Sequence, residues 1–317
     1  MNSITRKLVL SILTVVLTVI ALGTTTFAWF TLTNTAAVQP FQAEITSDTG
    51  IEVALGVPVA GEEDNLNWVT TLTTAAIQNF IEAEYSAFTF THVTTSNAID
   101  FQTLGISDMT NATSGYLEIP INFRSNSANR ILWSTVSLSS GAAPWQADVA
   151  FTGAKGTAYT AGGSISIDAA DAIRIAIVGT VGADPAHYVA YENPNSTTNV
   201  VLDGDGAAMD LRGTQEDIDP DPVLENLQYI GANGAMNYFY RKNASLPFGA
   251  QAVTVVNTIQ TLNNEPVLDL APSTTSGAAN YGQLVIRIWV EGWDANAFNS
   301  VLGRMITTSF GFTGATI

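Results

Sequence analysis

Two aspartates separated by one glycine are the residues best suited to metal binding. Asp203 and Asp205 form this pair, and Asp210 follows shortly after. Calcium takes several oxygen ligands, and a loop containing glycine is flexible enough to gather carboxylates around the ion. The spacing is not that of an EF-hand, since Ala207 and Thr214 stand where acidic ligands would be needed. We expect either a calcium site at Asp203, Asp205 and Asp210 or a solvated acidic loop.

A second group of residues could bind sugars. Trp289 and Trp293 lie close to Glu291 and Asp294 in the sequence, near the end of the chain. Exposed indole rings can stack on sugar rings while neighbouring carboxylates bind hydroxyl groups. Tryptophans in β-sandwiches also serve as packing residues, because they combine a large apolar ring with one polar N–H group. The sequence leaves both alternatives open for Trp289 and Trp293.

Catalytic chemistry has few candidate residues. The chain has no cysteine, and its two histidines, His92 and His187, are far apart. A Cys-His site is therefore excluded, a serine triad has few candidate bases, and neither histidine has a partner at metal-ligand spacing. A carboxylate pair for glycoside hydrolysis remains open, because its spacing is set by the fold. We expect no enzyme, and no cofactor other than calcium. His92 is expected in a strand and His187 in a loop.

Short runs in which apolar and polar residues alternate are the commonest pattern in the chain. This period-two alternation is typical of half-buried strands, and clusters of Gly, Ser, Thr and Asn between the runs predict turns. We therefore expect an all-β fold, an antiparallel β-sandwich of jelly-roll type. Pro120, inside one run, predicts a sheet edge or a bulge. The runs lie at 30–38, 117–123, 165–167, 173–177 and 284–290.

Helical patterns are rarer than strand patterns. Apolar residues at three- and four-residue spacing predict a helix over 67–84. A second, short helix is expected over 295–302, with Asp294 as its N-cap. The stretch 184–243 is rich in aspartate, glutamate and proline, and we expect it to form a long, solvated acidic insertion between strands.

The N-terminus has the order of a secretory signal. Arg6 and Lys7 precede an uncharged apolar run over 8–22, and small residues lead to Ala28. We expect signal peptidase to cut between Ala28 and Trp29, so that 1–28 is removed and the mature protein is secreted to the cell surface or beyond. The alternative is an uncleaved membrane anchor, since roughly 20 apolar residues span a bilayer.

Charge and composition narrow the class of partner. The chain carries 28 acidic and 11 basic residues, a net charge of −17. We expect no nucleic acid as a partner, because binding to phosphates requires a basic surface. The acidity favours solubility and attraction for cations. The apolar content of 46% is that of a chain with a real core.

Several segments resemble a known family. The N-terminal stretch 24–31, Thr-Thr-Thr-Phe-Ala-Trp-Phe-Thr, and the strand-like stretch 50–55 resemble the export signal and first strands of the TasA and camelysin-like proteins. These are secreted β-sandwich precursors cut by the SipW-type signal peptidase. The stretches 172–175, 286–294 and 305–312 are similar to later strands of exported proteins with that type of signal.

We expect a secreted structural subunit of extracellular filaments or a surface layer, and the resemblance implies the fibres of a biofilm matrix. In such a homopolymer, a strand at 29–42 would leave the sandwich domain, 43–317, and add to the sheet of the next subunit. The membrane would be a partner only before signal cleavage. Alternatives are pairing of 29–42 within its own sheet, a monomeric calcium- or carbohydrate-binding adhesin, and a carboxylate-based hydrolase. The apolar residues expected to enter the neighbour are Phe30, Leu32, Ala36 and Val38.

Overall fold

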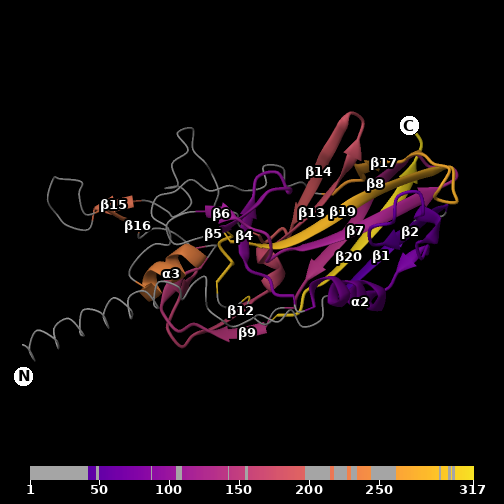
Figure 1. Cartoon of the computed structure of the whole chain (residues 1–317). Coiled ribbons are helices and arrows are strands. Elements are labelled where there is room, and N and C mark those ends of the chain that lie inside the picture. Colours follow the sequence, from indigo (N-terminus) through magenta and orange to yellow (C-terminus); the bar gives the residue numbers. More distant parts are fainter. Residues whose placement is uncertain are drawn as a thin grey trace, which may run out of the picture.

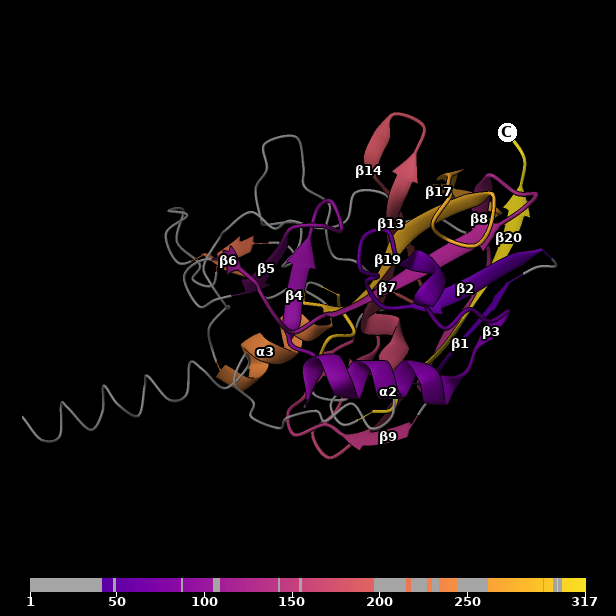
Figure 2. The ribbon, with the colours of Figure 1, turned by 45° about the vertical axis from the view of Figure 1, so that its right-hand side comes forward.

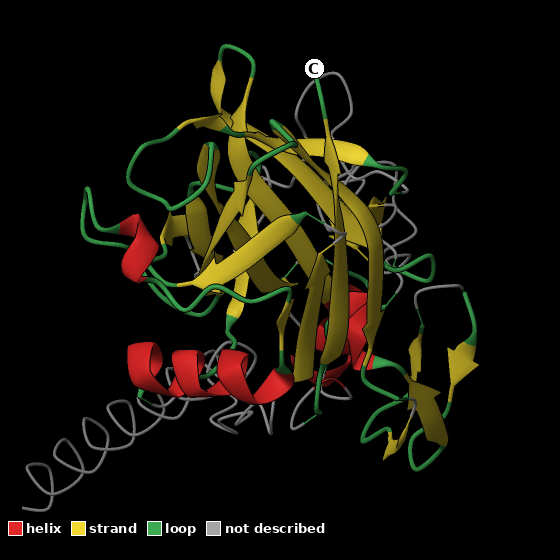
Figure 3. Cartoon of the chain, turned by 90° about the vertical axis from the view of Figure 1, so that its right-hand side faces the viewer, coloured by secondary structure: helices red, strands yellow, loops and turns green. Residues whose placement is uncertain are grey.

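Most of the described residues belong to β-strands, which form two large sheets and three two-stranded ones (Figures 1 and 3). The computed structural model describes residues 42–47, 50–86, 88–104, 109–141, 143–153, 156–196, 215–217, 227–229, 234–243, 262–292, 294–298, 301 and 304–317.

The smaller of the two large sheets has five strands and contains the first and last strands of the described chain. Three of its neighbouring pairs are antiparallel, whereas β1 runs parallel to β20. The strand order is β17 (Glu265–Asp269), β8 (Arg130–Ser139), β20 (Thr307–Ala315), β1 (Gln42–Ser47) and β3 (Thr71–Leu72).

The larger sheet has nine strands built around the long strand β19 (Asn280–Glu291). On one side of β19 lie β13 (Ile173–Val181) and then β14 (Asp184–Glu192). On the other side β7 (Leu117–Ser125) runs antiparallel to β19, and β4 (His92–Thr95) pairs in parallel with its end. The remaining strands are β2 (Ile51–Leu55), β5 (Phe101–Leu104), β6 (Met109–Asn111) and β18 (Ala271–Pro272).

Short elements complete the described structure. The two helices are α2 (Thr74–Tyr85) and α3 (Ala235–Asn243), with 3-10 turns at Glu63–Asn65 and Ala169–Ala172. Three hairpin-like pairs join β9 (Ala143–Gln146) with β12 (Ser164–Ile167), β10 (Phe151–Thr152) with β11 (Ala158–Tyr159), and β15 (Gln215–Asp217) with β16 (Leu227–Tyr229).

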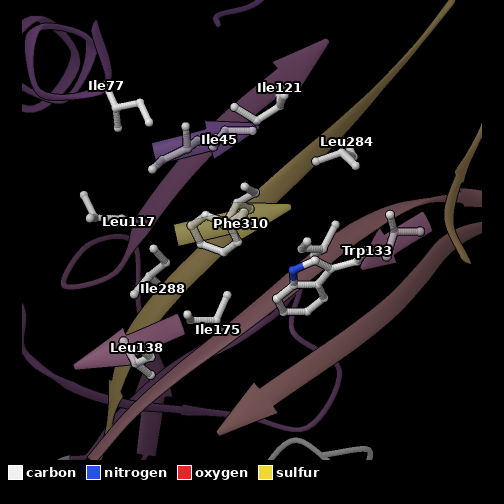
Figure 4. Close-up of a cluster of buried hydrophobic side chains, with 14 of the residues drawn as sticks. Ile45, Ile77, Leu117, Ile121, Trp133, Leu138, Ile175, Leu284, Ile288 and Phe310 are labelled. Carbon is white, nitrogen blue, oxygen red and sulfur yellow. The ribbon is translucent and has the colours of Figure 1, made fainter. Parts of the chain in front are cut away.

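The core lies between the two large sheets, where alternate residues of facing strands meet (Figure 4). Ile175 on β13 and Ile288 on β19 come from the larger sheet, and Trp133 and Phe310 come from the smaller one. Their side chains are 0 to 2% exposed, and burial of each is worth ~1.5–3 kcal/mol. The all-β sandwich predicted from alternation is confirmed. The parallel pairs make both sheets mixed, and the jelly-roll connectivity stays a prediction.

Pro120 lies inside β7 but at a point where one neighbouring strand has stopped. β2 pairs with β7 only as far as Leu55 and Ile121. Gly56 then turns away with a φ of +97°, and its N–H donates to the carbonyl of Pro120 at 3.1 Å. The nitrogen of Pro120, which has no N–H, points to the same side as its carbonyl, away from β19. The pairing of β7 with β19 therefore continues unbroken past Pro120. The prediction of an edge holds locally.

The first predicted helix is shorter than expected, since α2 covers only Thr74–Tyr85. Residues 67–73 are not helical, because Val69 bridges to Val53 and β3 pairs with β1. Thr73 then caps α2 through its hydroxyl, which accepts from the N–H of Ala76 at 3.3 Å. Ile77 and Ile81 are the buried residues of the helix. Of the second helix predicted over 295–302, residues 295–298 form a turn and a bend, and Val301 is in 3-10 conformation, so none of its described residues is α-helical.

The predicted insertion at 184–243 begins and ends in ordered structure. Its first nine residues are β14, an edge strand of the larger sheet, so His187 lies in a strand and not in a loop. Its last residues form α3, whose Tyr238 is fully buried against Trp145, Phe151 and Phe298. These boundaries of the prediction are wrong, because β14 pairs within the larger sheet and α3 packs on aromatic residues of β9 and β10.

Candidate functional site

Most of the residues singled out from the sequence lie outside the described residues. Among the residues that the structure does describe, no group of three or more His, Asp or Glu side chains is arranged to hold a metal ion. The calcium site therefore stays a prediction. The residues outside are Ala28, Trp29, Phe30, Leu32, Ala36, Val38, Asp203, Asp205, Asp210 and Trp293.

Trp289 is described, and its side chain is fully enclosed. It lies near the end of β19, is 0% exposed, and contacts the ring of Phe101 edge-on at 5.4 Å between centroids. Its indole N–H donates to Oε2 of Glu291 at 3.1 Å, and Glu291 is itself only 2% exposed. A ring so enclosed cannot stack on a sugar, so packing and not ligand binding describes Trp289.

A buried ion-pair network lies beside Trp289 and was not predicted. Arg174 on β13 is 1% exposed and forms 2.6 Å contacts with Glu192 on β14 and with Asp294 after β19. Burial alone would lower the pKa of Arg174, but Asp294, Glu192 and Glu291 raise it overall. Burial raises the pKa of Asp294 despite the pull of Arg174. The network joins β13, β14 and the turn after β19, so its role is structural.

A cleft on the outer face of the larger sheet is a candidate binding site formed by described residues. It consists of two hollows of about 510 and 380 Å³ that share Tyr85 and Glu118. Figure 2 shows α2, which ends at Tyr85, below β4 and β7. Val57, Phe80, Glu84, Pro120, Gln283 and Val285 complete the first hollow. Phe88, Thr89, Thr91, Thr113, Ser114, Gly115 and Tyr116 complete the second.

The cleft exists because β2 is short. Beyond Leu55 the chain turns off the sheet at Gly56, which leaves residues 117–120 of β7 without a strand partner on that side among the described residues. The hydroxyl of Tyr85 takes the place of a strand there, donating to the carbonyl of Glu118 at 3.0 Å and accepting from its N–H at 2.9 Å. Tyr85 is thus fixed at the junction of the two hollows.

Tyr116 is held by a stack of aromatic rings that reaches the interior. Its ring lies parallel to that of Phe101, with 3.9 Å between centroids and 12° between planes. Phe101 is 3% exposed and rests in turn on Trp289. Tyr116 itself is only partly buried and lines the second hollow. The buried tryptophan therefore supports an aromatic side chain that reaches the cleft.

Carboxylates give the cleft a negative character. Glu118 is paired with Arg287, whose Nε lies 2.8 Å from Oε1, while Glu84 is exposed on α2. Burial raises the pKa of the Tyr85 hydroxyl, and the negative charges of Glu118 and Glu84 raise it further. Burial and Glu118 likewise raise the pKa of Tyr116. The cleft thus combines aromatic rings, hydroxyl groups and carboxylates.

The two histidines do not belong to this cleft. His92 lies on β4, as expected, and is partly buried. Burial lowers the pKa of His92 to about 4, although a hydrogen bond with the backbone of Ala297 acts in the opposite direction and raises it. His187, on β14, has Nδ1 3.8 Å from Oδ2 of Asp184.

The first described strand is a folded part of the smaller sheet. The β1–β20 ladder begins at Gln42 paired with Thr307, which is also the first residue of β20. On its other side β1 pairs with β3 at Ile45 and Thr46. Gln42, expected in the donor segment, therefore belongs to the sandwich, and the boundary between the two moves to 41/42.

Comparison with known proteins yields no relative. No family model, curated protein or solved structure matches the chain. Within the described part of the chain, no helix is long and apolar enough to cross a membrane.

Proposed function

We propose that the protein is a secreted structural subunit that assembles into extracellular filaments, each subunit giving an N-terminal strand at 29–41 to the next. The observation that carries the proposal is the position of β1. Residues from Gln42 onward are anchored in the smaller sheet, in register with the first residue of β20. The alternating segment 29–41 directly precedes this anchored strand in the sequence.

The chemistry of the segment suits strand addition. Phe30, Leu32, Ala36 and Val38 fall on one face of an extended segment, and 29–41 contains no charge. An extended segment of this kind gains main-chain hydrogen bonds at a sheet edge while its alternate side chains enter apolar pockets. A head-to-tail contact between identical subunits does not close on itself, so it extends into a filament.

Export fits this assembly. The order of charged, apolar and small residues up to Ala28 is that of a cleavable signal, and the SipW-type peptidase is the partner that the resemblance implies. Cutting between Ala28 and Trp29 would free the segment at 29–41 only after the chain has left the cytoplasm. Polymerisation inside the cell would thereby be avoided.

Electron microscopy of two purified chains tests the proposal. The chain from Trp29 to Ile317 should form filaments, and the chain from Gln42 to Ile317, which keeps β1 complete, should remain as single particles. Leu32→Asp should abolish filaments because it places a charge on the apolar face of the segment. Thr33→Asp, with the same charge on the opposite face, should not. Single particles of both unmutated chains would refute strand donation.

A further inference from the structure

The cleft between α2 and β7 has the shape of a site for a chain-like ligand. Its two hollows, of about 510 and 380 Å³, meet over Tyr85 and Glu118 and are open to solvent at the surface of the larger sheet. A ligand that filled both would have to be extended and segmented. Small-molecule sites are typically concave, with a few polar groups placed among apolar and aromatic ones, as here.

The lining chemistry matches that of a saccharide. Each hollow has aromatic rings: Phe80 and Tyr85 in the first, and Tyr85, Phe88 and Tyr116 in the second. Ring faces pack against the C–H groups of sugar rings. Hydroxyl groups, which can donate to and accept from sugar hydroxyls, and carboxylates, which accept from them, stand among the rings. They come from Thr89, Thr91, Thr113, Ser114, Glu84 and Glu118.

The carboxylates of the cleft favour uncharged saccharides over acidic ones. Glu84 brings an exposed carboxylate to the cleft, and Glu118 brings one that is paired with Arg287. Arg287 is engaged by Glu118 and by the carbonyl of Ala98, to which it donates at 2.6 Å. The protein as a whole carries a net charge of −17. Acidic sugars would be repelled, whereas uncharged sugars would not.

The cleft is held in shape before any ligand arrives. Tyr85 is fixed by two hydrogen bonds to the backbone of Glu118, and Tyr116 is fixed by its stack on Phe101. Phe88 contacts Tyr85 edge-on, with 5.4 Å between ring centroids. Binding therefore costs little loss of side-chain freedom, which is the advantage of a preorganised site.

We propose that this cleft binds an uncharged oligosaccharide, with Tyr116 and Tyr85 as the main stacking residues and Glu118 and the surrounding hydroxyls as hydrogen-bonding groups. This site is independent of strand donation. A filament subunit with such a cleft would attach its fibre to a surface or matrix made of neutral glycans.

Binding of the chain from Trp29 to an array of neutral oligosaccharides, beside oligouronates of equal length, tests the proposal. We expect neutral glycans to bind and oligouronates not to bind. In calorimetry with the best-bound glycan, Tyr116→Ala should weaken binding at least about tenfold, equivalent to ~1.4 kcal/mol. Tyr116→Phe should bind like the unmutated chain, because it keeps the ring and its stack.

Two charge-reversal variants at exposed residues of α2 test the charge selectivity of the cleft without changing a buried side chain. Glu84→Lys should allow oligouronates to bind, because it replaces a carboxylate of the lining with a cation. Glu82→Lys, on the exposed side of the same helix but outside the lining, should not allow it. Absence of binding to every neutral glycan, a preference of the unmutated chain for oligouronates, or full binding by folded Tyr116→Ala would each overturn the proposal. None of these outcomes bears on filament formation.

Discussion

Lowering the pH should destabilise the fold through His92, a partly buried residue of β4. Burial lowers the pKa of His92 from its ordinary 6.5 to about 4. Above about pH 6.5 the imidazole is neutral in both the folded and the unfolded chain, so it has no effect on the free energy of unfolding. As the pH falls from there toward 4, the unfolded chain binds a proton that the folded chain does not, and stability is lost.

The size of the loss follows from the two pKa values. Between about pH 7.5 and about pH 4.5, a histidine titrating at 6.5 when unfolded and near 4 when folded lowers the free energy of unfolding by ~2.5 kcal/mol. The imidazole is only partly buried, and solvent screening reduces the expectation to ~2 kcal/mol. Below about pH 4 the folded chain is protonated too, and this contribution levels off.

Urea denaturation at the two pH values, with unmutated protein and His92→Gln, isolates this effect. Carboxylates such as Asp269, whose pKa Arg130 lowers, also destabilise the fold in acid, but equally in both proteins. His92→Gln should therefore lose ~2 kcal/mol less on acidification than the unmutated chain. His187→Gln, in edge strand β14, is the matched control and should behave like the unmutated chain. Equal pH dependence of all three proteins would refute the reasoning.

Two further predictions concern the interior. Arg174→Met should lower the free energy of unfolding by ~3–5 kcal/mol, because it leaves the buried carboxylate of Asp294 without its cation. Arg287→Met, which breaks a more exposed pair, should cost ~1 kcal/mol, and equal losses in urea denaturation would contradict the account. Gly179→Ala should cost ~1–3 kcal/mol, because its Cβ would lie 2.2 Å from the carbonyl oxygen of Val267. A calorimetric melting temperature unchanged from that of the unmutated protein would show that β17 moves away freely.

Strands were predictable from local pattern, whereas pairing was not. Alternation located β7, β13 and β19, because one face of each is buried in the sandwich. It could not show that β1 and β20 pair in parallel, since that depends on contacts between the two ends of the chain. The helix predicted at 67–84 lost its first half to strand pairing, as tertiary contacts outweighed local spacing.

The candidate site was largely hidden in the sequence. Trp289 drew attention as a ligand residue, but its role is to support Phe101 and Tyr116 from within. The cleft joins α2, β7 and the loops at 88–91 and 113–116, which only folding brings together. The aromatic spacing of Tyr85 and Phe88 was a usable signal. Likewise, Arg174 near the start of an apolar strand signalled a buried carboxylate partner, because a buried cation needs one.

Amide hydrogen exchange over residues 30–38 tests strand donation most directly, because strand addition forms main-chain hydrogen bonds in that segment. The account predicts slow exchange of these amides in assembled filaments and fast exchange in dispersed subunits, with the amides of β1 protected in both. Equally fast exchange at 30–38 in filaments and in dispersed subunits would contradict it, because the filaments would then be held together by another part of the molecule.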